Sequence, residues 1–86
     1  MANAEIYTNG SCAYCVAAKT LLKQRGFDYE EKRIDTNPAN FAEMLTRVNQ
    51  RSVPQVFVNG EHIGGFEELV AADRAGKLAQ PLGDSA

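Results

Sequence analysis

Short apolar segments separated by Gly, Pro and Asn divide the 86-residue chain into a series of predicted elements. Ala4–Thr8 carries β-branched and aromatic residues and is predicted to be a strand. Phe27–Ile34 alternates enough between apolar and polar residues to be a second strand. In VPQVFVNGEHIGG, Asn59-Gly60 lies between two apolar runs, which is the strongest short-range signal of a β-hairpin.

Three helices are predicted between and after these strands. The first runs from about Ala13 to Gln24 and ends just before a glycine. Asn37-Pro38 is a cap followed by proline at the first helical position, and it opens the second helix. Gly64-Gly65 breaks the chain before a third helix at about Phe66–Ala75, and the final QPLGDSA is expected to fray.

The resulting order, β-α-β-α-β-β-α, predicts a single α/β domain over residues 1–86. The first strand–helix–strand unit must be a right-handed parallel crossover, whereas the last two strands pair antiparallel. We therefore expect a four-stranded mixed sheet flanked by three helices. Met44 and Val48 are expected on the inner face of the second helix. The other predicted core positions are Ile6, Leu21, Leu22, Phe41, Leu45, Val56, Val58 and Leu69.

Composition narrows the function classes. With 44% hydrophobic and 23% charged residues, the chain should fold as an ordinary globular domain. Its net charge of −2, with both signs interspersed, does not indicate a positively charged surface that would bind nucleic acid. Its apolar runs fall far short of the ~20 residues of a membrane helix, and MANAEIYTNG lacks the pattern of a secretory signal. A cytoplasmic protein is expected, and there a Cys-x-x-Cys pair is more often catalytic or metal-binding than structural.

Both cysteines lie in NGSCAYCVAAK, at the predicted start of the first helix and the carboxyl end of the first strand. A helix N-terminus favours a thiolate through its partial positive charge and its unpaired N–H donors. Cys12 should face solvent and attack, whereas Cys15, one turn further, should be more buried and resolve. A disulfide between them closes too short a loop to stabilise the fold much. Two Cys and His62, expected on the hairpin surface, do not make a four-ligand zinc site.

CAYC, SVPQVFVNG and GGFEEL at these spacings resemble the glutaredoxins, specifically the small dithiol bacterial type, from about Ala4 to Leu82. The resemblance implies a thioredoxin-like fold and a monomeric, cytoplasmic thiol–disulfide oxidoreductase. Glutathione would be its reducing cosubstrate, with no tightly bound cofactor and no metal. Cys12 would attack a protein disulfide or a glutathionylated protein, and glutathione or Cys15 would release the product.

The resemblance also implies a groove for glutathione. Pro54 would be cis, leaving the backbone of Val53 able to pair with the tripeptide; without the family, a trans proline starting an edge strand is the default. Backbone N–H groups at the start of the third helix suit the γ-glutamyl carboxylate, and Arg51 matches a basic residue that clamps the other carboxylate. The implied binding residues are Tyr14, Arg51, Val53, Pro54, Gly65, Phe66 and Glu67.

The chain departs from the pattern of this family at several positions. Ala13 stands where proline is usual, and Asn9 replaces a lysine whose charge would attract glutathione. Phe66 takes a place more often small or polar, and Glu67 and Glu68 are longer than the usual aspartates. These changes predict weaker glutathione binding than in a typical member.

Two alternative functions stay open. Some glutaredoxins without the motif proline hold a 2Fe–2S cluster between two subunits, ligated by the N-terminal cysteine and two glutathiones, and only Cys12 would be required from this chain. A dithiol electron donor that ignores glutathione and serves one partner enzyme would instead depend on Cys15.

Overall fold

The computed structural model describes residues 4–78, so the QPLGDSA tail lies outside the described residues. The elements are β1 (Ala4–Thr8), α1 (Ala13–Gln24), β2 (Tyr29–Arg33), α2 (Pro38–Arg47), β3 (Gln55–Val58), β4 (Glu61–Gly64) and α3 (Phe66–Arg74). The predicted order is confirmed. The second strand, predicted over Phe27–Ile34, spans only Tyr29–Arg33; Phe27 precedes it and is buried in the core. No helix among the described residues is long and apolar enough to span a membrane.

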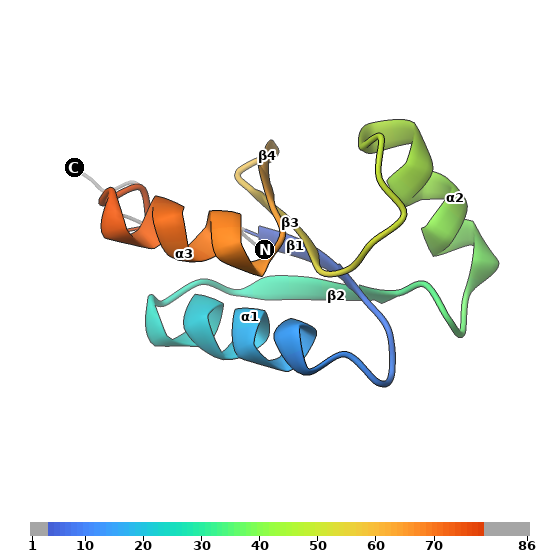
Figure 1. The fold of residues 1–86 in the computed structure, drawn as a ribbon, viewed down its shortest axis with the longest axis horizontal. Helices are drawn as coiled ribbons and strands as arrows, with labels where there is room; N and C mark the ends of the chain where they lie inside the picture. Colours follow the sequence, from blue (N-terminus) through green and yellow to red (C-terminus); the bar gives the residue numbers. More distant parts are fainter. Residues whose placement is uncertain (1–3, 79–86) are drawn as a thin grey trace.

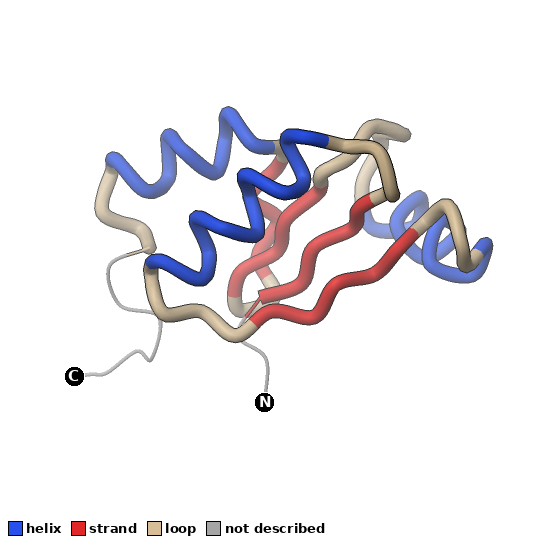
Figure 2. The backbone as a smooth tube through the Cα atoms, turned by 90° about the horizontal axis from the view of Figure 1, so that it is seen from below, coloured by secondary structure: helices blue, strands red, loops and turns tan. Residues whose placement is uncertain are grey.

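The four strands form one mixed sheet in the order β2-β1-β3-β4. β1 pairs parallel with β2, while β3 pairs antiparallel with both β1 and β4. Helices α1 and α3 lie side by side on one face of this sheet, and α2 packs on the other face (Figure 1 and Figure 2). The predicted four-stranded sheet flanked by three helices is confirmed.

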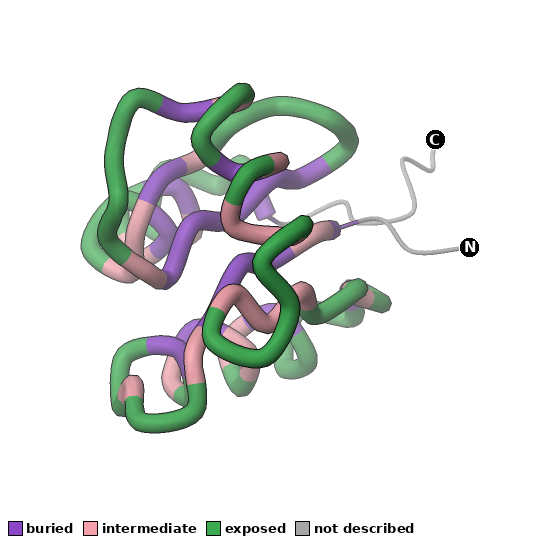
Figure 3. Tube along the Cα trace, turned by 90° about the vertical axis from the view of Figure 1, so that its right-hand side faces the viewer, coloured by how far each residue is buried: buried purple, intermediate pink, exposed green. Residues whose placement is uncertain are grey.

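Side chains on the two faces of the sheet build two hydrophobic clusters, because successive residues of a strand point to opposite sides. Ile6 packs with α1 and α3, whereas its neighbour Tyr7 packs against α2. Most buried segments lie in the interior, and most exposed ones form outer turns and loops (Figure 3). The cluster under α1 and α3 comprises Ala4, Ile6, Ala18, Leu22, Phe27, Val56, Val58, Leu69 and Leu78.

One predicted core residue is misplaced. Met44 is fully buried, as expected, but Leu45 is 38% exposed. Helix α2 contacts the sheet along one stripe, formed by Phe41, Met44 and Val48 at helical spacing. At about 100° per residue, Leu45 lies about 40° beyond Phe41, on the side away from Met44, and so at the edge of that stripe. Helix α2 has only 10 residues and contacts the sheet along this narrow stripe, which leaves Leu45 partly exposed.

Charged side chains also hold α2 on the sheet. Arg47 pairs with Glu5 at 2.8 Å and stacks its guanidinium 3.7 Å above the ring of Phe57. The Tyr7 hydroxyl donates to Glu43 at 2.8 Å and accepts from Arg47 at 2.9 Å. Arg47 holds the pKa of Glu5 below its ordinary value, so this carboxylate is ionised at neutral pH.

Candidate active site

Cys12 is the N-cap residue of α1, with the extended backbone that this position requires. Its sulfur accepts a hydrogen bond from the backbone N–H of Cys15 at 3.1 Å. A helix is usually capped by the side-chain oxygen of Ser, Thr, Asp or Asn, whereas here the Cys12 sulfur takes that role. Cys12 is half-buried. A hydrogen bond from a helix N-terminus stabilises a thiolate over a thiol.

A short loop between β1 and α1 presents Cys12, and it is fixed by side chains. The Gly10 N–H donates to Asp35 Oδ2 at 2.9 Å, and the Ser11 N–H donates to Asn9 Oδ1 at 3.0 Å. Arg33 forms two hydrogen bonds with Asp35 and holds the pKa of that carboxyl far below its usual range. Asp35 was not predicted from the sequence, because its contact with Gly10 spans 25 positions of the chain.

Cys15 lies on the buried side of α1, with 1% of its surface exposed. Burial and the neighbouring Cys12 sulfur raise the pKa of the Cys15 thiol to about 12. The predicted asymmetry in exposure is therefore confirmed. At neutral pH Cys15 is therefore a protonated thiol.

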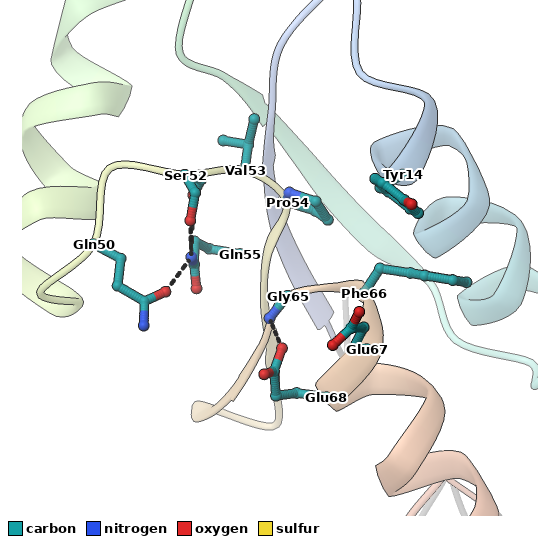
Figure 4. Close-up of a pocket in the computed structure, with 10 residues that line it drawn as sticks. All are labelled: Tyr14, Gln50, Ser52, Val53, Pro54, Gln55, Gly65, Phe66, Glu67 and Glu68. Atoms are coloured by element: carbon teal, nitrogen blue, oxygen red, sulfur yellow. Dashed lines mark hydrogen bonds between the residues drawn. The ribbon is translucent and has the colours of Figure 1, made fainter.

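A cavity of about 310 Å³ lies between the Gln50–Gln55 segment, the start of α3 and the first turn of α1 (Figure 4). The sulfur of Cys12 lies 3.8 Å from the carbonyl oxygen of Val53, which lines the cavity. The Val53–Pro54 peptide bond is cis, as the family resemblance implied. The lining residues are Tyr14, Gln50, Ser52, Val53, Pro54, Gln55, Gly65, Phe66, Glu67 and Glu68.

Most of the predicted binding residues meet at this cavity, but Arg51 does not line it. Arg51 is exposed on the loop between two residues that do, Gln50 and Ser52. Tyr14 and Phe66 form a pair whose ring centroids are 5.8 Å apart, with the planes tilted by 30°. Phe66, one of the departures from the family pattern, thus joins α3 to α1 and supplies an apolar wall of the cavity.

Glu67 and Glu68 line the cavity at the start of α3, and Glu68 also caps this helix. The Gly65 N–H donates to Glu68 Oε1 at 2.9 Å, which makes Glu68 the capping-box residue of α3. The Glu68 carboxylate therefore already accepts a hydrogen bond from the Gly65 N–H, one of the backbone donors that the family resemblance implied for glutathione. Gly64 has a φ of +124°, and a Cβ there would lie 2.8 Å from the Cβ of Glu68, so only glycine fits.

A buried amide supports the wall nearest Cys12. Gln55 is 1% exposed, and its Nε2 donates to Gln50 Oε1 at 2.9 Å and to the Ser52 carbonyl at 3.0 Å. His62, exposed on β4 as predicted, lies with Nε2 at 2.8 Å from Gln55 Oε1. Gln55 was not predicted as a site residue, although it is a polar residue within the apolar run VPQVFV. Within residues 4–78 no group of three or more His, Cys, Asp or Glu side chains could hold a metal ion.

A mixed sheet with a Cys-x-x-Cys pair at the start of its first helix defines a thioredoxin-like thiol–disulfide oxidoreductase. The glutaredoxin family model matches residues 4–63. The chain belongs to the glutaredoxin family.

Relatives and solved structures agree with this assignment. Glutaredoxin 3 of Escherichia coli K12 is 46% identical over 78 residues, covering 91% of this chain and 94% of that protein. A glutaredoxin of Pseudomonas aeruginosa is 41% identical over 73 residues, covering 85% and 87%. The buckwheat glutaredoxin–glutathione complex superposes with a TM-score of 0.81 at 33% identity, over 94% of this chain and 76% of that one. Brucella melitensis glutaredoxin gives 0.77 at 36% identity, over 95% and 89%.

Proposed function

We propose that the protein uses glutathione to reduce protein disulfides and glutathione mixed disulfides. The observation that carries this proposal is the cavity beside the Cys12 sulfur, bounded by Val53 on one side and by Tyr14 and Phe66 on the other. The similarity to a buckwheat glutaredoxin in complex with glutathione supports the choice of ligand. Glutathione is the cosubstrate, and the reaction itself uses no tightly bound cofactor or metal.

The reaction has two exchange steps. The Cys12 thiolate attacks the glutathione sulfur of a mixed disulfide, and the substrate protein leaves as a thiolate that takes up a proton. A second glutathione thiolate then attacks the glutathione sulfur bound to Cys12, forming oxidised glutathione and restoring the Cys12 thiolate. With a protein disulfide, Cys12 attacks one of its sulfurs and releases the other as a thiolate. Cys15 then attacks the Cys12 sulfur and releases the second protein thiolate, and two glutathiones reduce the resulting Cys12–Cys15 disulfide, leaving as oxidised glutathione.

Binding of glutathione uses the backbone on both sides of the cavity. The N–H groups of Phe66 and Glu67, at the first two positions of α3, receive the γ-glutamyl carboxylate, since Glu68 engages the N–H of Gly65. The backbone of Val53, next to Pro54, pairs with the cysteinyl residue of the tripeptide.

Arg51 and Tyr14 complete the proposed groove. Arg51, on the exposed loop outside the cavity lining, receives the glycyl carboxylate. Tyr14 covers the apolar part of the tripeptide.

The different surroundings of the two thiols support separate roles for them. Because burial and the Cys12 sulfur raise the pKa of Cys15 to about 12, Cys15 is protonated at neutral pH. When Cys12 becomes part of a mixed disulfide, its charge and its hydrogen bond to Cys15 disappear, which removes two of the causes that raise the pKa of Cys15. Cys15 thus gains reactivity after Cys12 has attacked. We expect the protein to act as a monomer in the cytoplasm, where glutathione is kept reduced.

The test is reduction of a small glutathione mixed disulfide, followed by NADPH oxidation through glutathione reductase. Wild type and Cys15→Ser should both turn over, and Cys12→Ser should be inactive. Absence of glutathione-driven turnover in wild type would contradict the proposal. A dithiol donor with a dedicated partner would be inactive with glutathione and would require Cys15. A glutathione-ligated 2Fe–2S dimer would show brown colour after anaerobic reconstitution and would lose it in Cys12→Ser.

A further inference from the structure

Gln55 is a buried amide whose hydrogen bonds hold the loop beside the active thiol. It begins β3, one of the two inner strands of the sheet, and the three strand residues that follow it are apolar. A buried amide with its hydrogen bonds satisfied fixes its surroundings, whereas one left without partners is costly. The carbonyl of Ser52 can only accept, so the Gln55 nitrogen must face it and the Gln55 oxygen must face His62.

The loop that Gln55 holds forms one wall of the cavity. Gln50 and Ser52, the two partners of the Gln55 nitrogen, both line the cavity, and Ser52 directly precedes Val53. The Val53 carbonyl is 3.8 Å from the Cys12 sulfur. This stretch belongs to no helix or strand and is largely exposed, whereas β3 is paired on both sides. The Gln55 side chain thus links this wall to β3 through its hydrogen bonds to Gln50 and Ser52 (Figure 4).

We propose that Gln55 is a positioning residue, which sets the affinity for the glutathione moiety by holding the Gln50–Val53 loop. This inference rests on the proposed glutathione-dependent function. His62 orients the amide from β4, and its ring lies 4.9 Å from the ring of Phe57. The four hydrogen bonds of Gln55 lead to the loop and to β4, whereas the Cys12 sulfur accepts from a backbone N–H of α1. Affinity should therefore respond more strongly than thiol reactivity, because the loop reaches the Cys12 sulfur only through the Val53 carbonyl, 3.8 Å away.

The decisive variant is Gln55→Met, which keeps the length of the side chain and removes its hydrogen bonds. We expect the KM for a small glutathione mixed disulfide to rise about tenfold, equivalent to ~1.4 kcal/mol, with kcat changed less than about twofold. The rate of Cys12 alkylation by iodoacetamide should also stay within about twofold. Gln24→Met, at the exposed end of α1, is the matched control and should leave all three values unchanged.

A second variant keeps the test decisive if Gln55→Met does not fold. His62→Phe, on the exposed edge strand, keeps an aromatic ring near Phe57 and removes only the partner of the Gln55 oxygen. It should raise KM by about threefold, since the bonds of Gln55 to Gln50 and Ser52 remain. An unchanged KM in this variant together with an unfolded Gln55→Met would overturn the proposal.

Backbone NMR relaxation separates this proposal from the proposed function, because it requires no glutathione. The order parameters of residues 50–53 should be lower in Gln55→Met than in wild type, while those of the first turn of α1 stay unchanged. Unchanged order parameters in the loop, or an unchanged KM in the folded variant, would refute the positioning role. An equal loss of kcat and alkylation rate would show a general structural role and would also contradict it. Wild type without glutathione-driven activity would refute the proposed function alone.

Discussion

Cys15 offers the sharpest test of how the fold changes the reactivity of a thiol. Burial is the largest cause that raises its pKa from 9.0 to about 12 in the folded protein. Unfolding in urea removes both the burial and the fixed contact with Cys12. Comparing the alkylation of Cys15 by iodoacetamide in the folded and the unfolded chain therefore measures the effect of the fold on a single residue.

The magnitude follows from the two pKa values. At about pH 8 the thiolate fraction of Cys15 falls roughly 1000-fold when its pKa rises from 9.0 to about 12. A more basic thiolate is a better nucleophile, and a Brønsted slope of ~0.4–0.5 over three pKa units recovers about 16- to 32-fold. The net expectation is that folded Cys15 reacts about 30- to 60-fold more slowly than unfolded Cys15, before any steric exclusion of the reagent.

The assay uses limiting iodoacetamide, so that each molecule carries at most one label, and tandem mass spectrometry locates the label within the CAYC peptide. In the folded protein nearly all label should be on Cys12, whereas in urea the two cysteines should be labelled to similar extents. A folded Cys15 that reacts within about threefold of its unfolded rate would refute the reasoning, because burial would then not be holding its proton.

Further outcomes test the packing of the fold by urea denaturation. Met44→Ala should lower the free energy of unfolding by ~2–5 kcal/mol because Met44 is fully buried, whereas Leu45→Ala should change it by about 0.5 kcal/mol or less; similar losses would contradict the corrected face of α2. Gly64→Ala should cost more than about 1 kcal/mol, because its φ is +124° and its Cβ would meet Glu68; unchanged stability would contradict this. Ionised Glu5, whose pKa is lowered by Arg47 from 4.5, should add stability that is complete above about pH 4.5 and is lost as the pH falls, so Glu5→Gln should show a weaker acid dependence.

Local patterns predicted the elements with the clearest boundaries. Ala4–Thr8 and Ala13–Gln24 have the predicted limits, and the Asn59-Gly60 turn joins β3 to β4. The start of α2 at Pro38 is also confirmed, because Asn37 caps the helix through its own side chain. These outcomes depend on contacts between residues a few positions apart, which a sequence shows directly. The burial of Cys15 relative to Cys12 belongs to the same group, since one helical turn separates the two.

Tertiary structure decided the features that join distant parts of the chain. Leu45 and Met44 are adjacent and both apolar, and only the placement of α2 on the sheet shows which one is buried. The contact of Asp35 with Gly10 and the pair of Tyr14 and Phe66 each bring together residues that are at least 25 positions apart. Burial of a polar side chain also depends on partners that the sequence does not mark. Gln55 is such a case, because its environment comes from a loop and a neighbouring strand that meet only when the sheet is complete.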